Sequence, residues 1–353
     1  MTRWRGRHGR GRRGLAAAAV ALAALALTAA ADPGEPEQVF EFADERIAES
    51  SGLAASQLHD GVYYTHNDSD DGAIVYAVDS SGATLAAITL QGVEARDWEA
   101  VAVGRDESGA PAVYVGDIGD NMTVSWPSVR VHRFTEPQAL TDASVAPTSY
   151  EFVYEDGARD AEALLIDPAD NRLYIVSKDI SGGMYAAPET LSTDGPNTLT
   201  RVGSAPMFVT DGAFSPDGSA FALRTYWSVH FYAEPDRLLD SAAVPQQDIG
   251  ESLTYTRDGA AVLVGAEGQG SAVWRVPVPA AALPEATAAP APSADPSAAA
   301  PEETESEPAE SEPPAEAAEP DGSGGPGTLG LIGTGAAVAA AAIAGIVVLA
   351  RRG

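Results

Sequence analysis

The chain has 353 residues, no cysteine and a formal net charge of −30 at neutral pH. The length allows one large or two medium domains. The missing cysteines exclude disulfides and thiolate metal sites, and the negative charge argues against nucleic acid as a partner, because phosphate would be repelled.

The first 31 residues have the layout of a secretory signal peptide. Several arginines precede an apolar run at residues 15–27, and Ala29, Ala30 and Ala31 are the small residues that a signal peptidase prefers. Arg12 and Arg13 form a twin arginine, but the residues after them fit that export pathway poorly. We therefore expect general secretion, with residues 1–31 as the signal peptide.

Residues 39–279 contain one pattern five times. In each copy, one or two polar residues, usually acidic, precede a small residue, an apolar strand, a turn and a second strand. The small residues are Gly52, Ala100, Ala163, Ala213 and Ser252. Their spacing is close to the ~40–50 residues of a propeller blade, with an insertion at residues 135–148. The last copy has no fourth strand, and a spare strand at residues 39–43 could complete it.

This repeat predicts an all-β domain at residues 39–279, a five-bladed β-propeller. Six blades are the alternative, if a degenerate blade lies in the insertion. Pairing of the N-terminal strand with the last copy would close the ring and remove exposed sheet edges. An open β-sandwich also uses many short strands, but it would not need the same acidic start five times. Asp217-Gly218 and Asp258-Gly259 predict tight turns between first and second strands.

The acidic starts of the repeats predict a functional mouth. First strands line the channel of a propeller, so Glu49 and Asp211 should converge there with other carboxylates, while residues at the ends of second strands, such as Asp68 and Glu267, form a second column. Oxygen ligands of this kind suit Ca²⁺. The predicted metal ligands are Asn67, Asp97, Glu99, Asp117, Asp160, Glu162 and Glu251. Alternatively, each side chain caps a strand, binds backbone amides or faces solvent.

Three further residues are candidates for catalysis. His66 could act as an acid or base, or could be a structural histidine, and Lys178 and Arg224 could pair with the acids or hold an anionic substrate group. The sequence contains neither a GxSxG nor an HExxH motif.

The C-terminal part predicts a membrane anchor. Residues 280–328 are rich in Ala, Pro and Glu without a basic residue, which predicts a disordered stalk. Residues 329–350 are apolar and long enough for a transmembrane helix, and Arg351 and Arg352 place the tail, 351–353, in the cytoplasm. A buried core helix is the alternative. No LPxTG motif precedes the run, so we expect a single-pass protein of the cell membrane with the propeller outside.

The segments at 66–69, 97–100, 116–121 and 160–164 resemble a family of secreted, mostly actinobacterial β-propeller proteins. More distantly, the chain is similar to phytase-like and esterase-like propellers, whose acidic clusters bind Ca²⁺ and, in phytases, phosphate. The resemblance covers most of residues 42–279. Phytases surround the phosphate with several basic residues, of which Lys178 and Arg224 match in location, so the resemblance implies calcium binding more than phytase activity.

Two functional hypotheses follow. In the first, a monomeric, membrane-anchored extracellular propeller binds Ca²⁺ at its acidic mouth and serves as a ligand-binding or scaffolding module. In the second, the domain is a metal-dependent hydrolase of phosphate esters or related esters. Glu99, Glu162 and Asp117 would then hold the ion, His66 or bound water would act as base, and Lys178 and Arg224 would bind the anion.

Overall fold

The computed structural model describes residues 34–68, 71–120 and 124–284. The regular structure of these residues is β-strand, apart from one 3₁₀ turn. The first sheet follows the order β2-β3-β4-β5-β9. Its strands are β2 (Ser50–Ala55), β3 (Val62–Asn67), β4 (Ile74–Asp79), β5 (Thr84–Leu90) and β9 (Ala143–Val145). β9 lies in the predicted insertion and pairs in parallel with β5.

The next sheet has eight strands, because two antiparallel groups join through a parallel pair. The first group is β6 (Trp98–Arg105), β7 (Pro111–Asp117), β8 (Val129–Thr135) and β10 (Thr148–Tyr154). The second group is β11 (Ala161–Ile166), β12 (Leu173–Ser177), β13 (Gly183–Ala186) and β14 (Asn197–Ser204). β10 and β14 form the parallel pair.

The two remaining sheets have four strands each. One consists of β15 (Val209–Phe214), β16 (Phe221–Thr225), β17 (Ser228–Glu234) and β18 (Arg237–Ala243). The other follows the order β1-β21-β20-β19, from β1 (Glu37–Glu41), β21 (Ala272–Pro277), β20 (Ala261–Val264) and β19 (Leu253–Tyr255). The spare N-terminal strand therefore completes the last sheet, as the sequence predicts.

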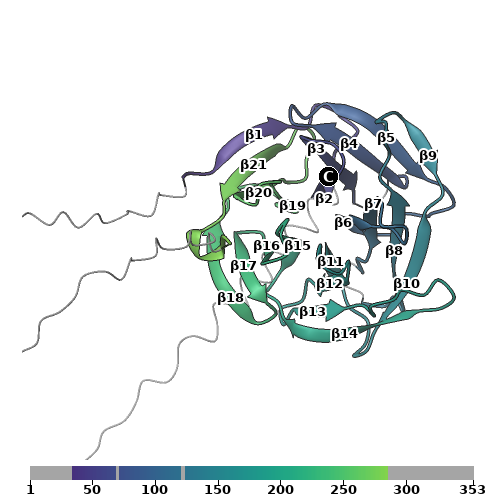
Figure 1. Ribbon diagram of the computed structural model, residues 1–353. Coiled ribbons are helices and arrows are strands. Elements are labelled where there is room, and N and C mark those ends of the chain that lie inside the picture. Colours follow the sequence, from purple (N-terminus) through teal and green to yellow (C-terminus); the bar gives the residue numbers. More distant parts are fainter. Residues whose placement is uncertain (1–33, 69–70, 121–123, 285–353) are drawn as a thin grey trace, which may run out of the picture. The chain divides into compact units, whose positions relative to one another are not determined.

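The first strands of the repeats lie around a common centre (Figure 1). β2 contacts β6, β6 contacts β11, β11 contacts β15, β15 contacts β19, and β19 contacts β2 again. Each sheet runs outward from this ring of inner strands. The all-β, propeller-like fold is confirmed, and the number of blades stays a prediction.

Tight turns join the inner strands to their partners. Gly218 and Gly259 have positive φ angles of 73° and 68°, a conformation that glycine adopts without steric cost. Asp217 and Asp258 accept hydrogen bonds from the backbone N–H two residues further on. The predicted Asp-Gly turns are thus confirmed.

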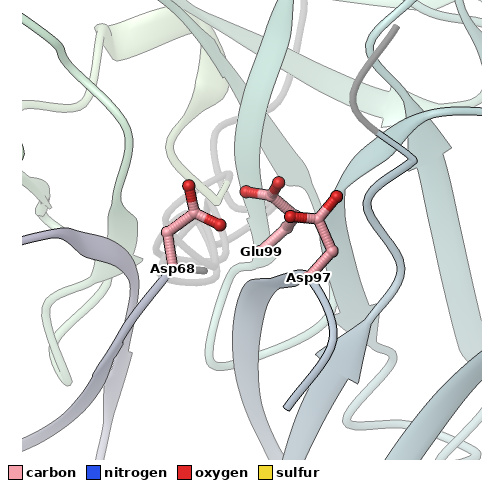
Figure 2. A group of neighbouring side chains, drawn as sticks. All are labelled: Asp68, Asp97 and Glu99. Carbon is pink, nitrogen blue, oxygen red and sulfur yellow. The ribbon is translucent and has the colours of Figure 1, made fainter. Parts of the chain in front are cut away.

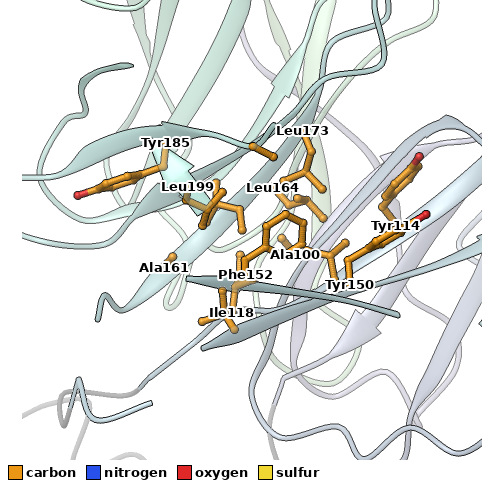
Figure 3. Close-up of a cluster of buried hydrophobic side chains, with 14 of the residues drawn as sticks. Ala100, Tyr114, Ile118, Tyr150, Phe152, Ala161, Leu164, Leu173, Tyr185 and Leu199 are labelled. Atoms are coloured by element: carbon orange, nitrogen blue, oxygen red, sulfur yellow. The ribbon is translucent and has the colours of Figure 1, made fainter. Parts of the chain in front are cut away.

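The largest core cluster lies between the β6–β10 group and the β11–β14 group (Figure 3). Phe152, Leu164 and Tyr185 are buried there, and all six residues of β11 are buried. Burial of each such large side chain contributes about 1.5–3 kcal/mol. Because the inner strands are covered on both faces, they read in the sequence as short apolar runs.

The packed region extends a little past Pro279. Ala280–Ala282 form the 3₁₀ turn, and Ala282 is buried in the same cluster as Val278. The predicted signal peptide, the stalk from residue 285 on and the predicted membrane span lie outside the described residues. Within the described part of the chain, no helix is long and apolar enough to cross a membrane.

Candidate functional site

A pairing irregularity marks the start of four inner strands. The ladder passes over one residue in each, namely Ser51, Glu99, Glu162 and Thr210. A bulge of this kind turns a side chain away from the regular alternation of the strand. Glu251 lies two residues before Leu253, the first paired residue of β19, at the corresponding place in the fifth repeat. Two of the bulges thus carry a glutamate, and Glu251 has the equivalent place in the fifth repeat without a recorded bulge.

The pairing corrects the alignment of the fourth repeat. Gly52 pairs with His66 and Asp211 pairs with Arg224, so Asp211 and not Ala213 corresponds to the small residue. Asp211 is therefore wholly buried, and its carboxylate accepts hydrogen bonds from Gly212 N at 2.7 Å and Leu253 N at 2.6 Å. Burial raises its pKa well above the ordinary value. Its role is to tie β15 to β19.

Three buried carboxylates converge at the first two sheets (Figure 2). Asp97 and Glu99 lie at the start of β6, and Asp68 follows β3. One oxygen from each lies within 4.8 Å of the other two, so the triad could hold a metal ion. A Cβ at Gly119 would lie 2.5 Å from Asp97 Oδ2 and 2.6 Å from Glu99 Oε1. Only glycine lets this backbone approach the triad so closely.

A second charged group lies beside the triad. Lys178 Nζ forms an ion pair with Glu162 Oε1 and lies 3.9 Å from Glu251 Oε1. The same nitrogen is 5.2 Å from the ring centre of Tyr226. The Oε2 atoms of Glu162 and Glu251 are buried and have no hydrogen-bond partner among the described residues. We call the carboxylates of both groups, with Glu267, the acidic mouth; it comprises Asp68, Asp97, Glu99, Glu162, Glu251 and Glu267.

Burial and mutual repulsion raise the pKa values of acids in this mouth. Burial raises the pKa of Glu99 well above its ordinary value, and the charges of Glu162 and Asp68 add to the effect. Burial also raises the pKa of Glu162, against the opposing pull of Lys178. The pKa of Glu267 rises to about 8 through burial and then through Glu251 and Asp68. Burial would lower the pKa of Lys178, but the attraction of Glu162 and Glu251 outweighs it and raises that pKa. A bound cation would displace protons from these acids.

Other predicted ligands make structural contacts. Asn67 Oδ1 accepts hydrogen bonds from the backbone N–H groups of Ala48 and Glu49, both at 3.0 Å. Asp117 Oδ1 accepts one from Asp97 N at 2.9 Å and lies 3.7 Å from Arg96 Nε. In each case the end of a second strand holds the segment that leads into the first strand. These residues position the backbone of the mouth.

Asp160 joins two repeats. Its Oδ1 accepts a hydrogen bond from Asp120 N at 2.9 Å, and burial raises its pKa. It thereby holds the loop after β7 next to the start of β11. This loop includes Gly119, so Asp160 supports the wall of the triad.

The predicted catalytic residues His66 and Arg224 are wholly buried. The His66 ring lies edge-on to Trp98 at 5.8 Å, its Nδ1 is 2.9 Å from Asn67 O, and burial lowers its pKa to about 4. Arg224 Nη1 donates to the carbonyl oxygens of Ser252, at 2.6 Å, and Gly265, and burial lowers the pKa of Arg224 to about 10. Of the three candidates, Lys178 alone lies among the carboxylates of the mouth.

Sequence reasoning missed several residues of the site. Asp68 and Glu267 belong to the predicted second column but were not among the predicted ligands. Gly119 could have been found, because it stands between two aspartates in a tight segment. Nothing in the sequence marks Tyr226, which meets Lys178 only through the fold.

Toward their other end, the inner strands line an open cavity of about 300 Å³, which we call the apolar cavity because most of its side chains are apolar, although serine, threonine and arginine residues also line it. Leu53, Val101 and Leu165 line it, and Arg105 and Arg257 lie at its border. These residues follow the carboxylate positions along the same strands. The cavity and the acidic mouth therefore lie toward opposite ends of the same inner strands.

The fold and site define a propeller-like, all-β protein with a buried acidic cluster that could hold a metal. No model of a protein family matches the chain, and no curated protein matches it. Among solved structures, it is similar to a gluconolactonase from Xanthomonas campestris, with 12% identity and a TM-score of 0.40 over 70% of this chain and 96% of that one. The fold assignment depends on the strand pairing described above.

Proposed function

We propose that this chain is a five-bladed, extracellular β-propeller that binds Ca²⁺ at its acidic mouth and serves as a ligand-binding module. The predicted span at 329–350 would hold it at the cell membrane. One observation carries the proposal: the buried carboxylates of Asp68, Asp97 and Glu99 converge from two sheets. Like charges that approach in a buried site need protons or a cation to offset their repulsion.

The donor set fits a hard cation. All three ligands are carboxylates, which suit Ca²⁺ better than a soft transition metal. With one oxygen atom from each carboxylate, the triad supplies three of the about six to eight oxygen ligands that Ca²⁺ takes. The remaining positions would be open to water or to oxygen atoms of a ligand, which explains how a binding module could use the ion.

Thermal unfolding of the purified full chain tests this proposal. Calcium should raise the melting temperature relative to EDTA. At a calcium concentration one hundred times the Kd, the free energy of unfolding should increase by about 2.7 kcal/mol. Asp97→Asn should abolish that rise, whereas Glu234→Gln, at an exposed carboxylate of β17, should keep it. Equal melting temperatures in calcium, magnesium, manganese and EDTA would refute the proposed ion site.

Hydrolysis of phosphate esters or related esters is the second candidate, and Glu267 is the observation that favours it. In the chain without an ion, burial and the charges of Glu251 and Asp68 raise the pKa of Glu267 to about 8, so a protonated Glu267 that does not bind the ion could donate its proton to the leaving group while a water molecule attacks the ester. Lys178 would keep its positive charge and stabilise an anion. A bound ion would polarise the ester oxygen. His66 and Asp117 would position the loops, since both are buried in structural contacts.

An assay with aryl phosphate esters and aryl carboxylic esters distinguishes the two functions. If the chain is a hydrolase, Glu267→Gln should lower kcat by about 100-fold or more, while Glu234→Gln leaves it unchanged. Calcium-dependent melting without turnover of either ester class would leave the binding module as the function.

A further inference from the structure

Exposed apolar side chains border the acidic mouth on one side. Ile180, Met207 and Trp227 are 67%, 49% and 54% exposed, although large apolar residues are usually buried. They come from the loops that follow β12, β14 and β16. With the partly buried Phe208 and Tyr226, they form what we call the apolar rim: Ile180, Met207, Phe208, Tyr226 and Trp227.

Contacts between the loops make this rim continuous. The Trp227 ring lies 6.1 Å from that of Phe208 and 5.8 Å from that of Tyr226. The loop that carries Ile180 is joined to the loop before Phe208, since Ala205 N donates to Gly182 O at 2.9 Å. Tyr226 links the rim to the acids, because its ring faces Lys178 Nζ.

Phe208 adds evidence that the rim is a built feature. Its φ angle is +59°, in the left-handed region that bulky side chains rarely adopt. Such a conformation is energetically unfavourable and persists only where the surroundings require it. Here it presents an aromatic ring to Trp227, itself more than half exposed.

Lys178 shows what kind of group this part of the mouth holds. Its ammonium lies between Glu162, Glu251 and the Tyr226 ring, which is how proteins bind a cation with an apolar stem. It contacts the Oε1 side of Glu162, and the buried Oε2 atoms of both glutamates lack a partner among the described residues. A second cation could use these oxygen atoms.

We propose that the apolar rim and Glu162 and Glu251 bind a cationic peptide segment of a partner protein. A lysine or arginine of that segment would approach Glu251 and Glu162, and its apolar neighbours would pack on Trp227 and Met207. Charge complementarity favours such a partner, since the chain carries a net charge of −30. Trp, Tyr and Met are also the residues that interfaces favour. This proposal names the ligand class of the proposed binding module but does not require the calcium ion.

Fluorescence anisotropy of the full chain with a labelled peptide of alternating arginine and leucine tests the proposal. The peptide should bind, and the same peptide with citrulline in place of arginine should bind at least about tenfold more weakly. Trp227→Ala and Glu251→Gln should each weaken binding by about tenfold or more. Leu238→Ala and Glu234→Gln are matched controls, because Leu238 is 52% exposed on β18 and Glu234 is exposed on β17.

Three results would overturn the proposal: equal binding of the citrulline peptide, unchanged binding by both site variants, or competition by free arginine methyl ester as strong as that by the peptide. Melting curves of each variant show whether it is folded, and Met207→Ala serves as a second rim variant. The same titration in calcium and in EDTA separates the two proposals. Peptide binding without calcium-dependent melting would refute the ion site alone, and the reverse would refute the peptide site alone.

Discussion

The same inner strands build two regions of different chemistry, the acidic mouth at one end and the apolar cavity at the other. On β6, Glu99 belongs to the acidic mouth, and Val101, two residues later, lines the apolar cavity. On β11, Glu162 and Leu165 show the same change. The apolar end contributes to stability by burial, whereas raised acid pKa values show that charge at the acidic end opposes folding. This difference is the reason why we propose the acidic end as the ligand site.

A carboxylate introduced at the apolar cavity should have the largest effect on stability. Val101→Glu would bury an unpaired carboxylate among the apolar residues that surround Val101, at a cost of about 3–5 kcal/mol. Urea unfolding measures the loss. Glu99→Gln, two residues earlier, is the matched control, and it should leave stability in EDTA nearly unchanged or slightly higher. Equal losses from both variants would show that the two ends do not differ as we describe.

A methyl group at the wall of the triad should have the next largest effect. The Cβ of Gly119→Ala would overlap the carboxylates of Asp97 and Glu99 and push them apart. We expect the calcium-dependent stabilisation to fall by about 1–3 kcal/mol, as measured by melting in calcium and EDTA. Gly195→Ala is a control, because no atom lies within 4 Å of its Cβ position. An unchanged calcium response in Gly119→Ala would place the ion elsewhere.

The sequence predicts those features of the two ends that depend on patterns of neighbouring residues along the chain. The strands, the Asp-Gly turns and the pairing of β1 with β21 follow from local patterns of apolar and turn residues. The acidic residues near the starts of the inner strands also follow, once the strands are arranged around a centre. These features need only the spacing of residue types along the chain.

The direction of individual side chains depends on pairing between distant strands. A bulge turns Glu99 toward the mouth, while the register of β15 places Asp211 in the interior. Arg224 lies opposite Asp211, so its guanidinium bonds to buried carbonyl oxygens and not to the mouth. Asp68 meets Asp97 only because β2 packs against β6. Residue type alone contains none of this information.

A change of pH should alter stability through the acidic mouth, with a smaller effect than the two substitutions above. An acid with a raised pKa in the folded chain binds more protons than in the unfolded chain, so its stabilising effect is lost as pH rises through the folded pKa. For Glu267 this window extends from 4.5 to about 8. In EDTA, the melting temperature should be higher near pH 5.5 than near pH 8 by about 3 °C or more.

Calcium and Glu267→Gln serve as controls for this measurement. Calcium should reduce the difference by stabilising the ionised acids, and Glu267→Gln should reduce it by removing one of them. A melting temperature that rises between pH 5.5 and pH 8 in EDTA would contradict the raised pKa values of the mouth.

The smallest effect is expected at the border of the apolar end. Arg257 pairs with Asp60, and both side chains are solvent-exposed, at 47% and 85%. Its Nη2 also donates to Gln57 O at 2.6 Å. Because exposed ion pairs contribute about 0–1 kcal/mol, Arg257→Ala should shift the melting temperature by no more than about 4 °C and leave the calcium-dependent rise intact. A lost calcium response in this variant would mean that the two ends are coupled through the inner strands, and the acidic mouth could then no longer be treated as an independent site.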